Sequence, residues 1–276
     1  MTLKELEREL SACGIEEAKW EAMLILERLF GQSPASLMVN RECDFDSAKI
    51  NPVLEKRKNR IPLQYIFGEW DFMGIGFYVS EGCLIPRPDT EILVQRALSE
   101  LKTGDRVADL CTGSGCIGLS LLMHSDKISH LTLMDISNDA LEISKKNAKR
   151  YSLDNKCRFI LGDITKDMPN EKFDMIASNP PYIPTRDIEG LGSEVKKEPH
   201  IALDGGCDGL DIIRFLISDG LNYLKPKGIM LIEFGYDQGQ IMDTLLKEKQ
   251  SKGLISSYEI LYDYGGNTRA CILYRS

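Results

Sequence analysis

The hydrophobic pattern predicts a helical domain over residues 1–71. Large apolar side chains recur there at spacings of three and four, the period of an amphipathic helix. Thr2 and Glu5 form a capping-box pair at the start of the first helix. A later helix is expected over residues 46–60, bent or delayed at Pro52.

Further along the chain, extended and helical patterns alternate. Residues 72–88 mix glycines with apolar residues, which favours a hairpin or linker. Within the domain expected over residues 89–276, the candidate strands are 107–110, 131–135, 158–161, 173–178, 229–234, 258–262 and 271–274. Strands separated by helices indicate a Rossmann-like α/β fold with a mostly parallel sheet of seven strands. The short turn at 263–267 makes the last strand antiparallel.

Composition narrows the class of protein. The 276 residues carry a net charge of −8, with 43% hydrophobic and 28% charged residues, which is ordinary for a globular protein. No apolar run approaches the roughly eighteen residues of a membrane span, and the acidic N-terminus is unlike a signal peptide, so we expect a cytoplasmic protein. The negative charge argues against nonspecific nucleic-acid binding. One basic run, residues 56–60, is either a solvated helix face or a contact for RNA or an acidic partner.

The cysteines do not predict a metal site. All eight are scattered, with no Cys-x-x-Cys pair and no nearby histidine pair. We therefore expect neither zinc nor a disulfide framework, and we interpret most of them as small buried residues.

A nucleotide-type cofactor is predicted at the end of the first strand of the sheet. A turn of small residues separates this strand from a helix, and the residues concerned are Asp109, Cys111, Thr112, Gly113, Ser114 and Gly115. Ligands of open parallel sheets bind beyond the carboxyl ends of the strands. Asp135 ends the next strand, where a carboxylate can accept both hydroxyls of a ribose, and Asp163 follows the third, in reach of an adenine. The same spacing would suit NAD.

The reacting chemistry is predicted at residues 179–182, where a buried strand runs into Asn-Pro-Pro-Tyr. Pro180 and Pro181 fix the backbone and remove two N–H donors. The side-chain oxygen of Asn179 and the carbonyl of Pro180 can each accept one hydrogen of a planar NH₂ group, and Tyr182 can stack on it. Two fixed acceptors would turn the nitrogen lone pair toward an electrophilic methyl group, without a metal or a covalent intermediate.

At these residues the chain resembles class I S-adenosylmethionine-dependent methyltransferases, and more narrowly the release-factor glutamine methyltransferases (the HemK/PrmC family). Four segments carry the resemblance: 84–91, 178–183, 198–206 and 263–267. It implies methyl transfer to N5 of the glutamine in the Gly-Gly-Gln motif of bacterial peptide chain release factors. We expect a monomer whose helical domain docks the release factor, with no DNA or membrane partner.

The resemblance also assigns roles by position. Cofactor contacts fall on Cys111 to Gly115 for the methionine part, Asp135 for the ribose, and Asp163 with Ile164 for the adenine. Asn179 would touch both cofactor and substrate, and Pro180, Pro181 and Tyr182 would complete the glutamine pocket.

Two positions depart from the family pattern. Cys111 stands where the family has the first glycine of the loop. If that position needs a positive φ, the cysteine costs roughly 1 kcal/mol. His200 replaces an arginine that usually follows Glu-Pro, so a charge contact there would be weaker or pH-sensitive.

Three other functions remain as alternatives. The first is methylation of a glutamine in a ribosomal protein, which requires the same chemistry. A second alternative is methylation of adenine N6 in DNA. The base would then have to be flipped out of the duplex, and the protein would have to bind the DNA phosphates, for which a net charge of −8 is unsuited. A silent cofactor-binding adaptor would be expected to lack Asn179 or Asp135, and both are present.

Overall fold

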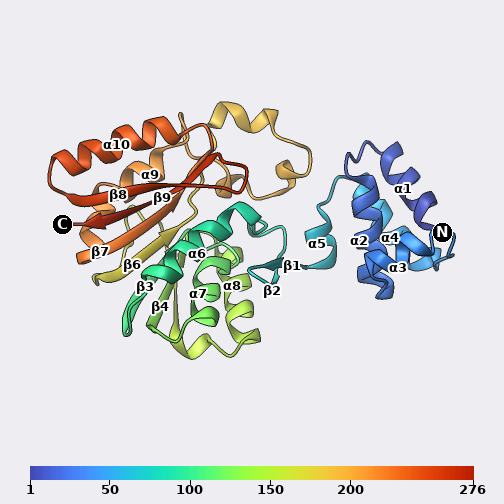
Figure 1. Cartoon of the computed structure of the whole chain (residues 1–276), viewed down its shortest axis with the longest axis horizontal. Coiled ribbons are helices and arrows are strands. Elements are labelled where there is room, and N and C mark those ends of the chain that lie inside the picture. The colour runs from blue at the N-terminus through green and yellow to red at the C-terminus, as the bar shows by residue number, and fades with distance from the viewer. The chain divides into compact units, whose positions relative to one another are not determined.

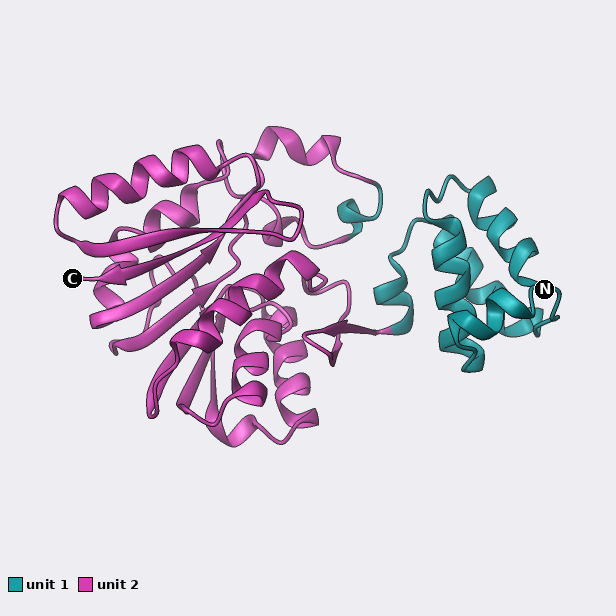
Figure 2. Cartoon of the chain, in the orientation of Figure 1, with its two compact units in different colours: residues 1–67, 193–197 teal, residues 68–192, 198–276 magenta.

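The computed structural model describes all 276 residues and divides into two compact units. The N-terminal unit comprises Met1–Phe67 together with Ser193–Lys197, and the second unit comprises Gly68–Gly192 and Glu198–Ser276 (Figure 2). A short segment from the middle of the chain therefore folds with the N-terminal helices.

The N-terminal unit is helical, as predicted. Its helices are α1 (Leu3–Ala12), α2 (Ala18–Phe30), α3 (Pro34–Val39), α4 (Ser47–Lys58) and α5 (Leu63–Phe67). The capping box of Thr2 and Glu5 is present at the start of α1. Helix α4 begins directly after its N-cap Asp46 and runs through Pro52, so the expected delay is not observed. The apolar faces of α1, α2 and α4 form one core.

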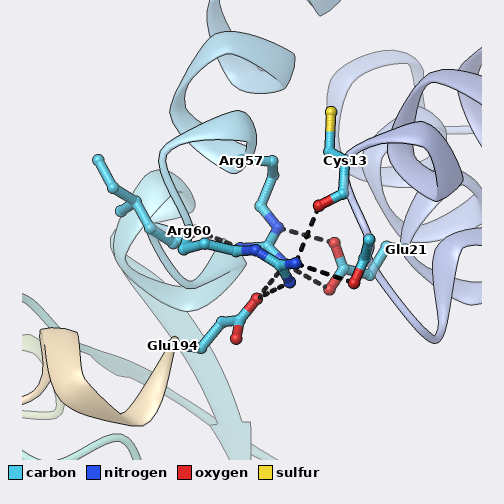
Figure 3. Close-up of polar contacts among 7 residues, drawn as sticks. Cys13, Glu21, Arg57, Arg60 and Glu194 are labelled. Atoms are coloured by element: carbon cyan, nitrogen blue, oxygen red, sulfur yellow. Dashed lines mark hydrogen bonds and ion pairs between the residues drawn. The ribbon is translucent and has the colours of Figure 1, made fainter. Parts of the chain in front are cut away.

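The basic run at the end of α4 is not a free basic face. The side chain of Arg57 is 1% exposed, and its guanidinium group donates to both carboxylate oxygens of Glu21, at 2.8 and 2.9 Å (Figure 3). Arg60 donates to the backbone carbonyls of Cys13 and Gly14, both at 2.9 Å, and to Glu194 at 2.9 Å. Both arginines of the run therefore make hydrogen bonds within the N-terminal unit, which argues against their binding RNA.

The second unit is built on the predicted sheet. Its strands are β3 (Asp105–Leu110), β4 (Ile128–Asp135), β5 (Cys157–Leu161), β6 (Phe173–Ser178), β7 (Leu224–Glu233), β8 (Ile255–Tyr262) and β9 (Thr268–Arg275). The order across the sheet is β5-β4-β3-β6-β7-β9-β8. All pairs from β5 to β7 are parallel, and β9 pairs antiparallel with both β7 and β8. The predicted fold class is confirmed.

Helices cover both faces of this sheet (Figure 1). One face packs against α6 (Glu91–Glu100), α7 (Cys116–His124) and α8 (Asn138–Arg150), and the other against α9 (Asp211–Leu216) and α10 (Gly239–Ser251). The inner strands β4, β3, β6, β7 and β9 are largely buried and are accordingly rich in apolar residues, whereas the edge strands β5 and β8 are mostly partly exposed. No helix of the structure is both long enough and apolar enough to cross a membrane.

A two-stranded hairpin precedes the sheet. It consists of β1 (Glu69–Phe72) and β2 (Ile75–Tyr78), so it begins before the segment in which the glycine pattern indicated one. Phe72 and Phe77 pack into the core beneath α6 and α8. Asn147 of α8 accepts from the Tyr78 amide at 2.7 Å and donates to the Ser114 carbonyl at 2.8 Å. One side chain thereby joins the hairpin to the turn after β3.

Candidate active site

A cavity lies in the second unit, at the carboxyl ends of β3, β4, β5 and β6. Of the residues expected at the site, those that line it are Cys111, Thr112, Gly113, Ser114, Asp135, Asp163, Ile164, Asn179 and Pro181. Four others do not line it: Asp109, Gly115, Pro180 and Tyr182. Parallel strands deliver residues far apart in the sequence to the same edge, which is why the separate motifs converge here.

The turn after β3 adopts left-handed backbone at alternate positions. Gly113 has φ 56° and Gly115 has φ 80°, and Cys111 has φ 59°. The condition that makes a cysteine costly at 111 is therefore met, at about 1 kcal/mol relative to glycine. Gly115 is also required by space, because a Cβ there would lie 2.6 Å from Oγ of Ser144 on α8.

Asp109 stabilises this turn from within the core. It is fully buried, and its Oδ2 accepts from the Thr112 hydroxyl at 2.6 Å and from the Gly118 amide of α7 at 2.9 Å. Burial raises the pKa of Asp109 to about 7, although these two hydrogen bonds oppose the shift. The carboxylate therefore acts through Thr112 and does not face the cavity.

Asp135 faces the cavity from the end of β4. One carboxylate oxygen accepts from the Gly113 amide at 2.8 Å, and the other accepts from the Ser137 amide at 2.9 Å. Burial raises its pKa above the ordinary value, and these amides counteract the shift. The Asp135 side chain is thus oriented by backbone on both sides, and each oxygen keeps a lone pair for a hydroxyl group.

Asp163 is held within its own loop after β5. Its Oδ1 accepts from the amide and the hydroxyl of Thr165, at 2.9 and 2.7 Å, and its Oδ2 pairs with Lys166 at 2.6 Å. The hydrogen bonds from Lys166 and Thr165 lower the pKa of Asp163 to about 2. The loop, with Gly162 and Ile164, forms one wall of the cavity.

Asn179 follows β6 directly and lines the cavity. Its Nδ2 donates to the hydroxyl of Thr90 at 3.2 Å. The preceding residue, Ser178, donates to the Leu110 carbonyl at 2.7 Å and so ties the end of β6 to the end of β3. The Asn179 amide nitrogen is therefore engaged with protein, and Oδ1 has no hydrogen bond within the chain.

Tyr182 is held by two side chains from the end of β7 and the start of α10. Its hydroxyl donates to Oε1 of Glu233 at 3.3 Å, and its carbonyl accepts from Nε2 of Gln238 at 2.9 Å. Burial, followed by the nearby charge of Glu233, raises the pKa of Tyr182. Glu233 itself is 1% exposed, and burial raises its pKa to about 7.

Sequence reasoning did not select several residues that belong to this site. Thr90 and Arg87 line the cavity and lie in the segment 84–91, which resembles the family but to whose residues the resemblance assigns no role. Glu233 follows the apolar run 229–232 at the end of β7, and an acidic residue in that place is the available signal. Glu198 is also buried, accepts from the Ile85 amide at 3.0 Å and pairs with Arg87.

His200 is exposed on the loop that follows Glu198. Its Nδ1 lies 3.8 Å from Oδ2 of Asp204, a residue that lines the cavity. The Thr185 hydroxyl and the Gly206 amide, with a smaller contribution from His200, lower the pKa of Asp204. The expected charge contact of His200 is therefore to an aspartate of its own loop.

Similar folds occur in solved methyltransferases. One neighbour is a methyltransferase from Pyrococcus furiosus, with 17% identity, a TM-score of 0.54, and coverage of 80% of this chain and 98% of that one. Another is the catalytic domain of hMettl16, with 17% identity, a TM-score of 0.56, and coverage of 72% and 75%. Residues 88–194 match the family described as methyltransferase small domain. These neighbours identify the fold as that of class I methyltransferases.

More specific relatives cover nearly the whole chain. Residues 2–68 match the family described as PrmC N-terminal domain. A release factor glutamine methyltransferase from Moorella thermoacetica is 35% identical, over 99% of this chain and 97% of the relative. Another from Aquifex aeolicus is 38% identical, over 94% and 92%. The chain belongs to the release factor glutamine methyltransferase family, which confirms the resemblance found in its motifs.

Proposed function

We propose that this protein transfers a methyl group from S-adenosylmethionine to the side-chain N5 of the glutamine in the Gly-Gly-Gln motif of a peptide chain release factor. The observation that carries the proposal is the orientation of Asn179, whose amide nitrogen is engaged by Thr90 while its oxygen stays available at the cavity. The family relationship supports the choice of substrate.

The residues at the cavity fit S-adenosylmethionine. Asp135 has two oxygens oriented by backbone amides, as a pair of ribose hydroxyls requires. A Cβ on Gly113 would have no neighbour within 4 Å, so the turn presents open backbone beside the cavity. Cys111 to Ser114 would bind the methionine part, and Gly162 to Ile164 the adenine. When bound, the cofactor supplies a methyl group on a positively charged sulfur.

Asn179 and Pro180 are proposed to orient the substrate. Oδ1 of Asn179 and the carbonyl of Pro180 would each accept one hydrogen of the glutamine NH₂ group. This holds the weakly nucleophilic nitrogen with its lone pair toward the methyl group. Held in this way, the nitrogen would receive the methyl group that the cofactor supplies, and the surplus proton of the product would leave to water. Tyr182, fixed by Glu233 and Gln238, would complete the pocket.

The N-terminal unit is proposed to dock the release factor. The family match over residues 2–68 supports a role specific to this family rather than to methyltransferases in general. We propose a cytoplasmic monomer that needs neither DNA nor a membrane.

Incubation with methyl-labelled cofactor and a purified release factor tests the proposal. Label on the Gly-Gly-Gln glutamine, located by peptide mass, is the expected result. Label only on a ribosomal protein or on added DNA would favour the corresponding alternative. Asn179→Ala should abolish turnover while leaving cofactor affinity within about tenfold, because Asn179 acts chiefly on the reacting nitrogen. Full methylation of the release factor by Asn179→Ala would show that the role proposed for Asn179 is wrong.

A further inference from the structure

We propose that Asn147 of α8 is a positioning residue for the cofactor turn, the segment 111–115 after β3, and that the hairpin of β1 and β2 contributes to cofactor binding through it. The inference deepens the proposed function and rests on the cofactor binding proposed there. Asn147 is fully buried and does not line the cavity. It therefore acts on the cofactor only through the residues that its amide group binds.

The Asn147 side chain makes three hydrogen bonds, all to backbone groups of the second unit. Its Oδ1 accepts from the Tyr78 amide at 2.7 Å. Its Nδ2 donates to the Tyr78 carbonyl at 3.0 Å and to the Ser114 carbonyl at 2.8 Å. A primary amide has one acceptor oxygen and two donor hydrogens, so both hydrogens are used and the oxygen has a partner. Neither an apolar residue nor a carboxylate could make the same set of contacts.

Tyr78 fixes the orientation of this amide. It ends β2, and its N–H and C=O both bond to Asn147, as two opposite residues of an antiparallel pair exchange two hydrogen bonds. A reversed amide would place Oδ1 against the carbonyls of Tyr78 and Ser114 and leave the Tyr78 amide without an acceptor. The hairpin therefore determines that Nδ2 faces the cofactor turn, although no residue of β1 or β2 lines the cavity.

The peptide units of the cofactor turn are held from two sides. The Gly113 amide donates to Asp135 at 2.8 Å, and the Ser114 carbonyl accepts from Asn147. Between them, the Ser114 amide has no acceptor within the chain, and Ser114 lines the cavity. This N–H group is therefore available to a bound cofactor. Asp135 on one side and Asn147 on the other set its direction.

Helix α8 also contacts the turn through Ser144, one helical turn before Asn147. A Cβ on Gly115 would lie 2.6 Å from Oγ of Ser144, so the turn fits closely against this face of α8. Without the Asn147 donor, the buried Ser114 carbonyl would be unsatisfied, which favours turn conformations in which it reaches water. Only molecules with the turn in its binding conformation bind the cofactor, so the apparent affinity falls with their fraction.

Calorimetric titration of the full chain with S-adenosylmethionine tests the inference. Asn147→Leu, of similar size, and Asn147→Ala both remove the donor to the Ser114 carbonyl. Each should raise the dissociation constant for S-adenosylmethionine by about tenfold or more. At saturating cofactor, kcat with release factor should stay within about twofold of wild type, because bound cofactor restores the turn and Asn147 touches neither reactant.

The matched control is Tyr151→Phe. The Tyr151 hydroxyl joins the end of α8 to the Gly76 carbonyl of β2 but makes no hydrogen bond to the cofactor turn. This variant loosens the hairpin without removing the donor to Ser114, so its affinity for S-adenosylmethionine should stay within about twofold of wild type. Hydrogen exchange of the wild type is a second measurement, which needs no variant. Bound cofactor should slow exchange of the Tyr78 amide, because coupling between two sites is reciprocal.

Three outcomes would overturn the inference. One is wild-type affinity for S-adenosylmethionine in a folded Asn147→Leu or Asn147→Ala, and another is an equal loss of affinity in Tyr151→Phe. The third, which holds even if both Asn147 variants fail to fold, is unchanged exchange of the Tyr78 amide when the wild type binds cofactor. In all three cases the wild type still binds S-adenosylmethionine and the proposed function stands. If the wild type does not bind it, the proposed function fails first.

Discussion

The carboxylate of Glu194 lies 3.2 Å from Nη2 of Arg57, although 137 positions separate the two residues in the sequence. Arg57 is already bonded to Glu21 and to the Ile61 carbonyl, so Glu194 meets a cation held in place by the helical fold. Nη1 of Arg60 lies 2.9 Å from the same oxygen of Glu194, so the carboxylate contacts two arginines. Burial alone would raise the pKa of Glu194, yet the hydrogen bonds from Arg60 and Arg57 hold it below the ordinary value. The ion pairs explain why Ser193–Lys197 folds with the N-terminal unit.

Glu194→Gln should loosen Ser193–Lys197 without unfolding the helices. The pairs are partly exposed, so their loss should cost about 1 kcal/mol or less. Hydrogen exchange at residues 193–197 should become faster, while exchange in α1 and α2 should be unchanged. Glu189→Gln, on the exposed 3₁₀ helix η3 (Thr185–Gly190), is the matched control. Equal protection of the segment in wild type and Glu194→Gln would contradict this account.

Arg57→Met should lower the stability of the N-terminal unit much more than Glu194→Gln does. It leaves Glu21 without its bidentate partner, and breaking a buried pair typically costs about 3–5 kcal/mol. Trp20 lies on α2, and the second tryptophan, Trp70, lies in the hairpin. Denaturant unfolding followed by Trp20 fluorescence, in a Trp70→Phe background, should show a transition at lower denaturant.

Cofactor affinity provides the control for that experiment, because the cavity is lined by the second unit alone. It should be unaffected by Arg57→Met. An unchanged Trp20 transition would mean that the buried pair contributes little to the stability of the helical unit.

Cys111 should be less favourable than glycine for backbone reasons. Its φ of 59° lies in the left-handed region, where a Cβ costs about 1 kcal/mol. Cys111→Gly and Cys111→Ala both remove the thiol, and they differ mainly in that Cβ. We expect Cys111→Gly to be the more stable of the two by about 1 kcal/mol in thermal unfolding. The reverse order would show that packing, not φ, dominates at this position.

Removal of residues 1–70 should affect a large substrate more than a small one. If the N-terminal unit docks the release factor, the KM for the intact factor should rise far more than the KM for a short Gly-Gly-Gln peptide. The affinity for S-adenosylmethionine should be preserved, because the cavity residues all follow residue 70. Equal rises for protein and peptide would count against docking.

The sequence alone determined the seven strands, their mostly parallel order and the places where they end. These are local properties: a buried strand is a short apolar run, and the residue after it must lie at the carboxyl edge of the sheet. That is why the strand ends in the sequence predict that Asp135 and Asn179 lie at the same edge of the sheet, where both line the cavity.

Only the tertiary structure decided what each of these side chains touches. Asp109 belongs to the cofactor turn in sequence but is buried behind it, because its side chain bonds to Thr112 and α7. Arg57 looked like surface charge until Glu21 and Glu194 were placed around it. Glu233 reaches Tyr182 across 51 positions, and Asn179 reaches Thr90 across 89. Periodicity and strand ends depend on neighbouring residues, whereas hydrogen-bond partners and desolvation depend on which distant segments the packed core brings together.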